Sequence, residues 1–286
     1  MSGPALVLVV CAAILHAIWN ALAKRADNQF VFLWCSVSLA TALLFPLGLL
    51  RLPAEPAPAN GLPFVAASVA IHALYFWALG RAYRHGDFSR VYPMARGLGV
   101  ALVPLVALPL FGEHLSWVGS LGVGLVVLGI AALGAMPVAT TSVARASGAG
   151  TFWALVTGLT IAAYSLVDKA GVARLHPMPY IALMGACLSV VLAPVVLADR
   201  PALGREWRRH WRTILVASAM NLTSYLLVLF AFRLSKVGYV VAARELSILF
   251  SAFIGSLWLG EGRLAPRLAG ASVVLAGVVC VALARE

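Results

Sequence analysis

The sequence predicts an all-α membrane protein with ten transmembrane helices, and three observations support this fold class. Of the 286 residues, 62% are hydrophobic and only 11% are charged, whereas a soluble domain carries roughly 25% charged residues. The apolar residues gather in runs of about 20, the length that crosses a bilayer as a helix. The second half of the chain also repeats features of the first. So few charges could not cover a water-exposed globule, which excludes an ordinary soluble enzyme and a disordered chain.

Ten apolar runs are separated by charges or by Pro, Gly and Asn, and we expect one span from each. The first run has no basic residue before it and continues past Trp19, which favours a retained helix over a signal peptide. Ten spans of about 21 residues occupy roughly 210 positions and leave no room for a soluble domain. The expected spans are 4–23, 30–50, 62–83, 88–111, 117–136, 151–172, 178–198, 213–234, 238–259 and 266–284.

The charge distribution predicts how the chain sits in the membrane. The net charge is +11, and a basic surface can indicate nucleic-acid binding, but basic loops on one membrane face produce the same total. We therefore expect no nucleic-acid partner. By the positive-inside rule, the richer loops are cytoplasmic and both termini lie on the non-cytoplasmic side of an inner membrane. Loops after odd-numbered spans hold thirteen cations, Lys24, Arg25, Arg81, Arg84, Arg90, Arg145, Arg200, Arg205, Arg208, Arg209, Arg212, Arg263 and Arg267, against five in the loops after even-numbered spans and the tail, Arg51, Arg174, Arg233, Lys236 and Arg285.

An internal duplication divides the chain into residues 1–138 and 139–286, each with five expected spans. An odd number of spans makes the second half enter the membrane from the opposite face, which gives an inverted repeat, an arrangement typical of secondary transporters. Most matching positions share an offset of 148 residues, and the earlier ones need small gaps. The matches are Phe111-Gly112-Glu113 with Leu259-Gly260-Glu261, Arg96 with Arg244, Gly122 with Gly270, Gly129 with Gly277, Ala82-Tyr83-Arg84 with Ala231-Phe232-Arg233, and Trp19-Asn20 with Tyr164-Ser165.

Two halves that each end in a Gly-Glu turn and a glycine-rich helix resemble the drug/metabolite transporter superfamily, in its EamA-like branch. The segments LHAIWNALAKRA (15–26) and VYPMARG (91–97) are also similar to that group, which includes the aromatic amino acid exporters of the YddG type. The resemblance implies ten helices around a central cavity lined by spans 1, 3, 4, 6, 8 and 9, with spans 5 and 10 outside it. It also implies export of amino acids or other metabolites. Relatives are often drawn with cytoplasmic termini, and here we keep the orientation that the charges favour.

Polar residues repeat at a spacing of three or four within the same spans, which places them on one helix face. Polar groups in hydrocarbon are costly and usually face the bundle interior or water. Arg96 and Arg244 lie several residues inside spans 4 and 9. The expected substrate-binding residues are His16, Trp19, Asn20, His72, Tyr75, Phe76, Tyr92, Arg96, Tyr164, Asp168, Asn221, Tyr225, Arg244 and Glu245.

Each of these residue types also has a structural explanation. A histidine can hydrogen-bond between helices, and an arginine can extend its side chain to the membrane surface. Glu245 could neutralise its neighbour Arg244, and Asp168 could pair with Lys169. Tyr83 and Tyr239 fit an interfacial aromatic belt better than a site, and Lys24 fits the cytoplasmic boundary. Glu113 and Glu261 lie in short turns that suit helix capping, while Pro93 favours a kink or a break in span 4.

Catalytic and cofactor motifs are absent from the sequence, with no HExxH, GxSxG, Walker or paired CxxC pattern. The four cysteines lie in apolar runs without paired spacing, so we expect core residues, no metal site and no cofactor. We predict a secondary transporter, not an enzyme, that works by alternating access as a monomer or weak homodimer. Its expected cargo is an amino acid with an aromatic or other apolar side chain. The alternatives are a nucleotide-sugar-like metabolite or a drug as cargo, an intramembrane lipid-modifying enzyme, or a membrane scaffold, and the coupling ion stays open.

Overall fold

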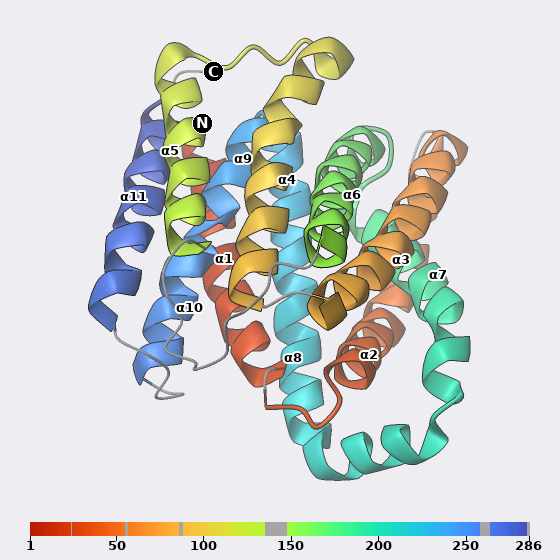
Figure 1. Cartoon of the computed structure of the whole chain (residues 1–286). Coiled ribbons are helices and arrows are strands. Elements are labelled where there is room, and N and C mark those ends of the chain that lie inside the picture. The colour runs from red at the N-terminus through yellow and green to blue at the C-terminus, as the bar shows by residue number, and fades with distance from the viewer. Residues whose placement is uncertain (24, 55–56, 86–87, 135–147, 258–263, 285–286) are drawn as a thin grey trace.

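The computed structural model describes residues 1–23, 25–54, 57–85, 88–134, 148–257 and 264–284. Within these ranges the chain forms helices joined by short turns, and no strand occurs among them (Figure 1). Two short 3-10 helices, Leu52–Ala54 and Pro58–Asn60, join the second and third helices. The α-helices are α1 (Gly3–Ala23), α2 (Gln29–Arg51), α3 (Leu62–His85), α4 (Phe88–Phe111), α5 (Trp117–Gly134), α6 (Gly148–Val172), α7 (Pro177–Leu197), α8 (Arg200–Leu234), α9 (Val237–Arg244), α10 (Leu246–Leu257) and α11 (Leu264–Leu283).

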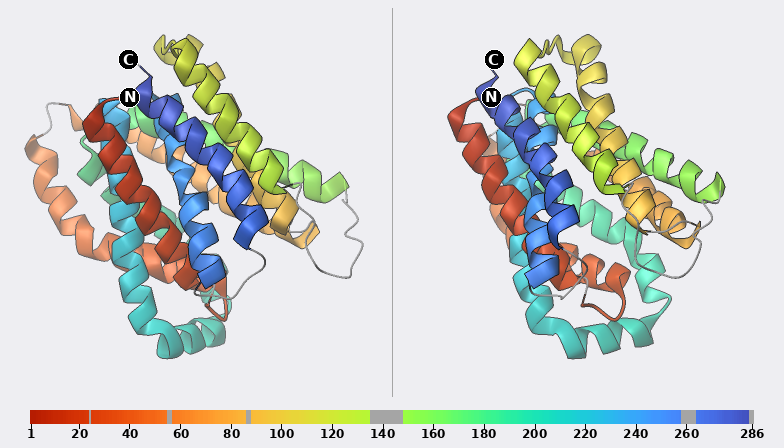
Figure 2. Two further views of the ribbon diagram at one scale, coloured as in Figure 1. Left: turned by 90° about the vertical axis from the view of Figure 1, so that its left-hand side faces the viewer. Right: turned by 60° about the vertical axis from the view of Figure 1, so that its left-hand side comes forward.

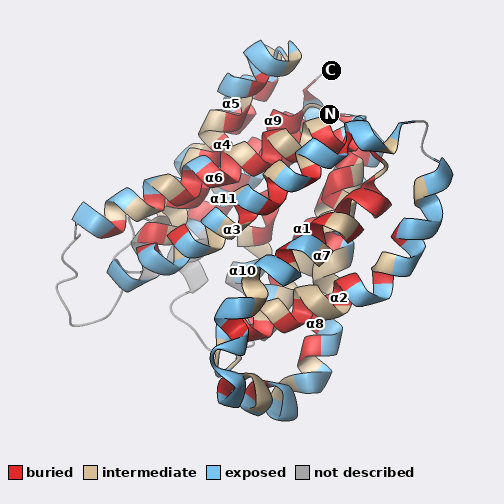
Figure 3. Cartoon of the chain, turned by 90° about the vertical axis from the view of Figure 1, so that its right-hand side faces the viewer, coloured by how far each residue is buried: buried red, intermediate tan, exposed pale blue. Residues whose placement is uncertain are grey.

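Eight helices in the described part of the chain, α1 to α8, are long and apolar enough to cross a bilayer. Large apolar side chains such as Leu50, Leu105 and Val190 are exposed on the outside of the bundle, where Figure 3 also shows many exposed positions. Because hydrocarbon is the solvent that suits such a surface, the protein is a multi-pass membrane protein. The predicted ninth span is divided between α9 and α10, and the tenth corresponds to α11.

A helix break lies in the predicted ninth span, at Glu245. The Glu245 N–H donates to the carbonyl of Ala242 at 3.1 Å, and the Ile248 N–H donates to the Glu245 carbonyl at 2.8 Å. These bonds join residues three apart, which tightens the backbone between α9 and α10. The break expected at Pro93 is not observed, because α4 is continuous from Phe88 to Phe111. Pro93 lies near the start of α4. Its missing N–H therefore costs only one hydrogen bond, to a carbonyl of the first turn, and the rest of the helix is unaffected.

Helices α5 and α11 pack side by side at the edge of the bundle (Figure 1). A Cβ atom added to Gly122 would lie 2.6 Å from the Gly277 carbonyl oxygen, and one added to Gly129 would lie 2.8 Å from the Val274 nitrogen and 3.0 Å from the Gly270 carbonyl oxygen. The close contact predicted from small residues in these two spans is therefore present. An early residue of α5 faces a late residue of α11, so the two helices are antiparallel.

Helix α8 is longer than the predicted span 213–234, because it begins at Arg200. The Asp199 side chain caps its start by accepting a hydrogen bond from the Ala202 N–H at 3.0 Å. The first part of α8 runs across the end of the molecule opposite to both chain termini before the helix turns into the bundle (Figures 1 and 2). Trp207 and Trp211 are exposed along this part.

Glu113 and Tyr239 have structural roles that differ in part from expectation. Glu113 accepts a hydrogen bond from the Val237 N–H at 2.7 Å and lies 3.3 Å from the Lys169 ammonium. It therefore caps α9 and not the helix that follows it, and Lys169 pairs with Glu113 instead of Asp168. Tyr239 is fully buried and its hydroxyl accepts from the Ser116 N–H at 2.9 Å, so the expected interfacial position is wrong. Lys24, Glu261 and the side chain of Tyr83 lie outside the described residues.

Candidate functional site

The centre of the candidate site is the carboxylate of Asp168 on α6, which is fully buried. Its Oδ1 accepts hydrogen bonds from the Ser68 hydroxyl at 2.6 Å and the Tyr180 hydroxyl at 2.7 Å. Its Oδ2 accepts from the Tyr225 hydroxyl. These donors come from α3, α7 and α8. Among the described residues Asp168 has no ion-pair partner, so hydroxyl groups alone compensate for its lost hydration.

His72 lies one turn from Ser68 on α3 and extends this network. Its Nδ1 lies 2.9 Å from the Ser68 carbonyl oxygen, so this nitrogen carries the proton and donates. Its Nε2 lies 3.4 Å from the Tyr225 hydroxyl, whose single hydrogen is directed to Asp168. The His72 ring stacks on Tyr164 with centroids 4.4 Å apart. The imidazole therefore joins the carboxylate network to an aromatic surface.

A second buried carboxylate, Glu245, forms an ion pair with Arg96. The Arg96 Nε donates to Glu245 Oε2 at 3.0 Å, and the second contact, from Nη2 to Oε1, is 2.7 Å. The first contact is a hydrogen bond and the second is an ion-pair contact alone, because Arg96 Nη2 has no hydrogen-bond partner among the described residues. The guanidinium also lies 5.8 Å from the centre of the Tyr92 ring. Glu245 is thus paired with an arginine of α4, and the expected neutralisation of its neighbour Arg244 does not occur.

Arg244 is buried at the end of α9 without an ion-pair partner among the described residues. Its Nη2 donates to the Tyr164 hydroxyl at 3.2 Å, and its Nε has no hydrogen-bond partner in the described part of the chain. Tyr164 therefore contacts Arg244 through its hydroxyl and His72 through its ring. Asp168 follows Tyr164 by one helical turn, so a cationic and an anionic group lie on either side of this tyrosine.

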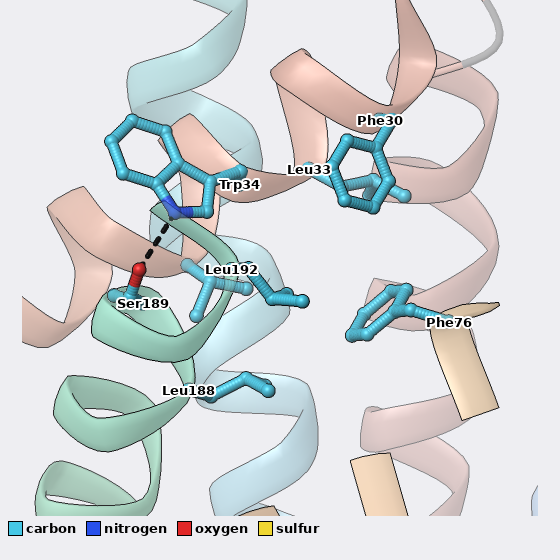
Figure 4. Close-up of a pocket in the computed structure, with 8 residues that line it drawn as sticks. Phe30, Leu33, Trp34, Phe76, Leu188, Ser189 and Leu192 are labelled. Carbon is cyan, nitrogen blue, oxygen red and sulfur yellow. Dashed lines mark hydrogen bonds between the residues drawn. The ribbon is translucent and has the colours of Figure 1, made fainter. Parts of the chain in front are cut away.

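Aromatic rings continue from Tyr164 toward an apolar pocket. Tyr75 contacts Tyr164 and Phe76 with ring centres 5.9 Å and 5.4 Å apart. Phe76 in turn packs edge-on against Phe30 at 6.5 Å. Both phenylalanines line the pocket drawn in Figure 4, which lies between α2, α3 and α7 and includes Trp34, whose indole donates to the Ser189 carbonyl at 2.9 Å. An apolar surface therefore adjoins the charged groups.

Asn20 and Asn221 are placed less centrally than the other expected residues, whereas His16 lies close enough to Arg96 and Arg244 to interact electrostatically with both. His16 and Trp19 contact each other edge-on at 5.1 Å and are half-buried. Asn20 is exposed, and its amide donates to the His16 carbonyl of its own helix at 2.7 Å. Asn221 is half-buried one turn before Tyr225. The structure does not bring Asn20 or Asn221 into hydrogen-bond contact with the Asp168 network.

Two members of the Asp168 network, Ser68 and Tyr180, were not expected from the sequence. Ser68 precedes His72 by four residues, so the spacing rule used for the other positions also identifies it. Tyr180 lies in the first turn of α7, a span that the resemblance did not include among those lining the cavity. No signal in the sequence points to its contact with Asp168.

Comparison with known proteins gives a family for the second half of the chain. Residues 148–283 match the EamA-like transporter family. The match is to membrane transporters. It supports a place for the chain in the drug/metabolite transporter superfamily. A solved structure titled only as the crystal structure of a protein is similar over 99% of this chain and 98% of its own, with a TM-score of 0.69 and 14% sequence identity. That similarity shows the fold alone. No curated protein matches the chain.

Proposed function

We propose that this EamA-like protein is a secondary transporter that exports amino acids with aromatic or other apolar side chains across the inner membrane. The observation that carries the proposal is the buried Arg244, whose guanidinium has no carboxylate partner among the described residues and whose Nε makes no hydrogen bond there. A buried cation without a close ion-pair partner is costly, and a carboxylate of the substrate would supply that partner.

The opposite end of a zwitterion has a partner in the same site. Asp168 follows Tyr164 by four residues, which is about 6 Å along an α-helix, and Tyr164 contacts Arg244. A substrate carboxylate on Arg244 would direct its ammonium toward Asp168, where it would replace one of the three hydroxyl donors. Tyr164, Tyr75 and Phe76 offer an aromatic surface beside these charges, against which an aromatic or other apolar side chain could pack.

Alternating access is supported by the way the helices pair. In the repeat, α1 corresponds to α6, α3 to α8, and α4 to α9 and α10 together. The contact of α1 with α8 therefore corresponds to that of α6 with α3. The contact of α4 with α6 corresponds to that of α9 and α10 with α1. Exchanging the two halves therefore turns each of these contacts into another observed contact. The same exchange converts the Gly122–Gly277 approach into that of Gly270 and Gly129. This correspondence favours the proposed inverted repeat, with solute crossing between the halves.

The proposed orientation places both termini on the non-cytoplasmic side. Arg200, Arg205, Arg208, Arg209 and Arg212 lie in the first part of α8, at the end of the molecule opposite to the termini (Figure 1). Basic residues concentrate on the cytoplasmic face. Labelling of single cysteines introduced at Ser2 and at Arg208 with a membrane-impermeant reagent in intact cells tests this orientation. We expect only the Ser2 site to react, and reaction of only the Arg208 site would reverse it.

Transport into proteoliposomes tests the function and the cargo. We expect saturable flux of labelled phenylalanine or leucine, and substitution Arg244→Ala or Arg96→Ala should reduce it by about tenfold or more, since 1.4 kcal/mol of binding free energy corresponds to a factor of ten. Arg51→Ala, at the exposed end of α2, is the matched control and should leave flux unchanged. No saturable flux of any amino acid would remove the proposed cargo, and equal effects of Arg96→Ala and Arg51→Ala would place Arg96 outside the path.

An anionic metabolite of the nucleotide-sugar class is the second candidate cargo. The guanidinium of Arg244 has no carboxylate partner among the described residues, and such a group binds phosphate as well as carboxylate. The same proteoliposomes loaded with a labelled nucleotide sugar distinguish the two candidates. Saturable flux of the nucleotide sugar without flux of amino acids would favour this alternative.

A further inference from the structure

A cluster of three potential metal ligands lies at the end of the molecule opposite to the termini, away from the proposed transport site. Asp27 lies in the turn between α1 and α2, and Glu206 and His210 lie one turn apart in the first part of α8. His210 Nε2 is 3.7 Å from Asp27 Oδ2 and 3.9 Å from Glu206 Oε1. One ligand atom from each residue lies within 4.8 Å of the other two.

These separations fit a single bound cation. Zinc binds imidazole nitrogen and carboxylate oxygen at about 2.0–2.2 Å. Two ligand atoms on one zinc ion therefore lie roughly 3.0–4.3 Å apart, depending on whether the ligand–zinc–ligand angle is close to a right angle or to a straight line. The two measured separations from His210 fall in that range. A small cation could therefore occupy the space between the three side chains with little movement of the helix or the turn.

A second, independent feature of the cluster indicates a missing partner. Glu206 is only 1% exposed, and its Oε2 accepts a hydrogen bond from the Asn28 N–H at 2.8 Å. Its Oε1 is buried and has no hydrogen-bond partner among the described residues, and neither has the buried Nε2 of His210. A buried carboxylate oxygen without a donor is costly. The two atoms without partners, Glu206 Oε1 and His210 Nε2, lie 3.9 Å apart. One cation bound between them would give both atoms a partner.

Arg209 is a cation that contacts the cluster. Its guanidinium lies 3.1 Å from Asp27 Oδ2, but the Arg209 side chain is 71% exposed and that of Asp27 is 48% exposed. Exposed ion pairs of this kind contribute little free energy. A metal ion could therefore take the Asp27 carboxylate, and the flexible Arg209 side chain would turn into solvent.

We propose that Asp27, Glu206 and His210 form a binding site for a divalent transition-metal ion such as Zn²⁺, with water completing the coordination. The imidazole ligand favours this class of ion over Mg²⁺ or Ca²⁺, which prefer oxygen ligands alone. Because its ligands come from the turn after α1 and from the start of α8, the ion would tie these two segments together. The site is independent of the proposed transport of amino acids.

Titration of the purified full chain in detergent with ZnCl₂, followed by calorimetry, tests the site. We expect one Zn²⁺ per chain, with an affinity that falls by about tenfold or more in Glu206→Gln and in His210→Ala, since each removes a ligand. Gln at position 206 retains an oxygen that accepts from the Asn28 N–H, so the local fold should persist. His114→Ala, in the exposed turn before α5, is the matched control and should bind Zn²⁺ as the unaltered protein does.

Thermal unfolding gives a second readout that does not depend on transport. Saturating Zn²⁺ should raise the unfolding temperature of the unaltered protein and of His114→Ala, because an ion that binds only the folded state stabilises it. At the same Zn²⁺ concentration it should raise the unfolding temperature of Glu206→Gln and His210→Ala by less, because each binds the ion more weakly. Unchanged Zn²⁺ affinity in both ligand variants, or no binding to the unaltered protein, would overturn the proposal.

Discussion

Asp168 and Glu245 are both buried carboxylates near the middle of the bundle, but their partners belong to different chemical classes. Asp168 receives three hydroxyl hydrogens from three other helices. Glu245 receives two contacts from one guanidinium, that of Arg96. The first lies inside the continuous helix α6, and the second lies where α9 ends and α10 begins. The charge of one is thus shared among neutral dipoles, while that of the other is cancelled.

This difference separates a group that can exchange partners from a group that holds the fold. One hydroxyl can leave Asp168 while two others remain, so a substrate ammonium or a proton can approach the carboxylate at limited cost. Glu245 cannot leave Arg96 without exposing two charges to a low-dielectric interior, which is far more costly. We infer that Asp168 takes part in the transport cycle and that Glu245 fixes the position of Arg96 and of the helix break.

The largest expected effect is that of Glu245→Gln on stability. The variant leaves the Arg96 charge buried without its counter-ion, and breaking such a pair costs roughly 3–5 kcal/mol. Thermal unfolding in detergent should show a clear loss of stability. In the double variant Glu245→Gln/Arg96→Met neither charge remains, and we expect most of the stability to return. An unfolding temperature unaffected by Glu245→Gln would contradict the role assigned to this pair.

Asp168→Asn should affect transport more than stability. An amide of nearly the same shape keeps one oxygen acceptor and loses part of the network, which costs about 1–3 kcal/mol. Because the amide carries no negative charge, we expect amino acid flux in proteoliposomes to fall by about tenfold or more. Ser68→Ala removes one donor and keeps the carboxylate, so it is the control and should retain more flux. Equal flux in Asp168→Asn and the unaltered protein would remove Asp168 from the cycle.

Tyr225→Phe and Tyr180→Phe give the smallest and most selective effect. Each removes one hydroxyl donor from Asp168, at a cost of about 1 kcal/mol for a typical hydrogen bond. Tyr225 is half-buried and also lies beside His72, whereas Tyr180 is fully buried against α3. We therefore expect Tyr225→Phe to change the KM for transport and Tyr180→Phe to change only the unfolding temperature. The reverse assignment would indicate that substrate approaches Asp168 from the α7 side.

The sequence was sufficient for the helices and for part of the site. Each span has its own apolar run of bilayer length, so local composition determines where α1 to α7 and the later part of α8 lie. The spacing of three and four residues within a span placed Tyr164 and Asp168 on one face of α6, because residues four apart share a helix face. The contact of Tyr164 with His72 joins two spans that the resemblance assigned to one cavity.

The contacts between distant segments could not be predicted in the same way. Arg96 meets Glu245 across 149 residues, and only the packing of α4 against α9 decides that this glutamate serves Arg96 and not its neighbour Arg244. No proline lies at Glu245, so nothing in the sequence indicated the tightened backbone there. Pro93, in contrast, suggested a break that α4 does not have. Asp27, Glu206 and His210 are likewise brought together by the course of α8, which the apolar runs do not determine.

The backbone contact between α5 and α11 limits which parts of the protein can move. Gly122 and Gly277 have no side chain that could change rotamer, and each carbonyl lies where the other residue's Cβ would stand. Sliding one helix along the other would bring peptide groups into overlap within a fraction of a helical turn. This pair therefore resists sliding of α5 along α11, and the proposed alternating access would have to arise from movement of other helices.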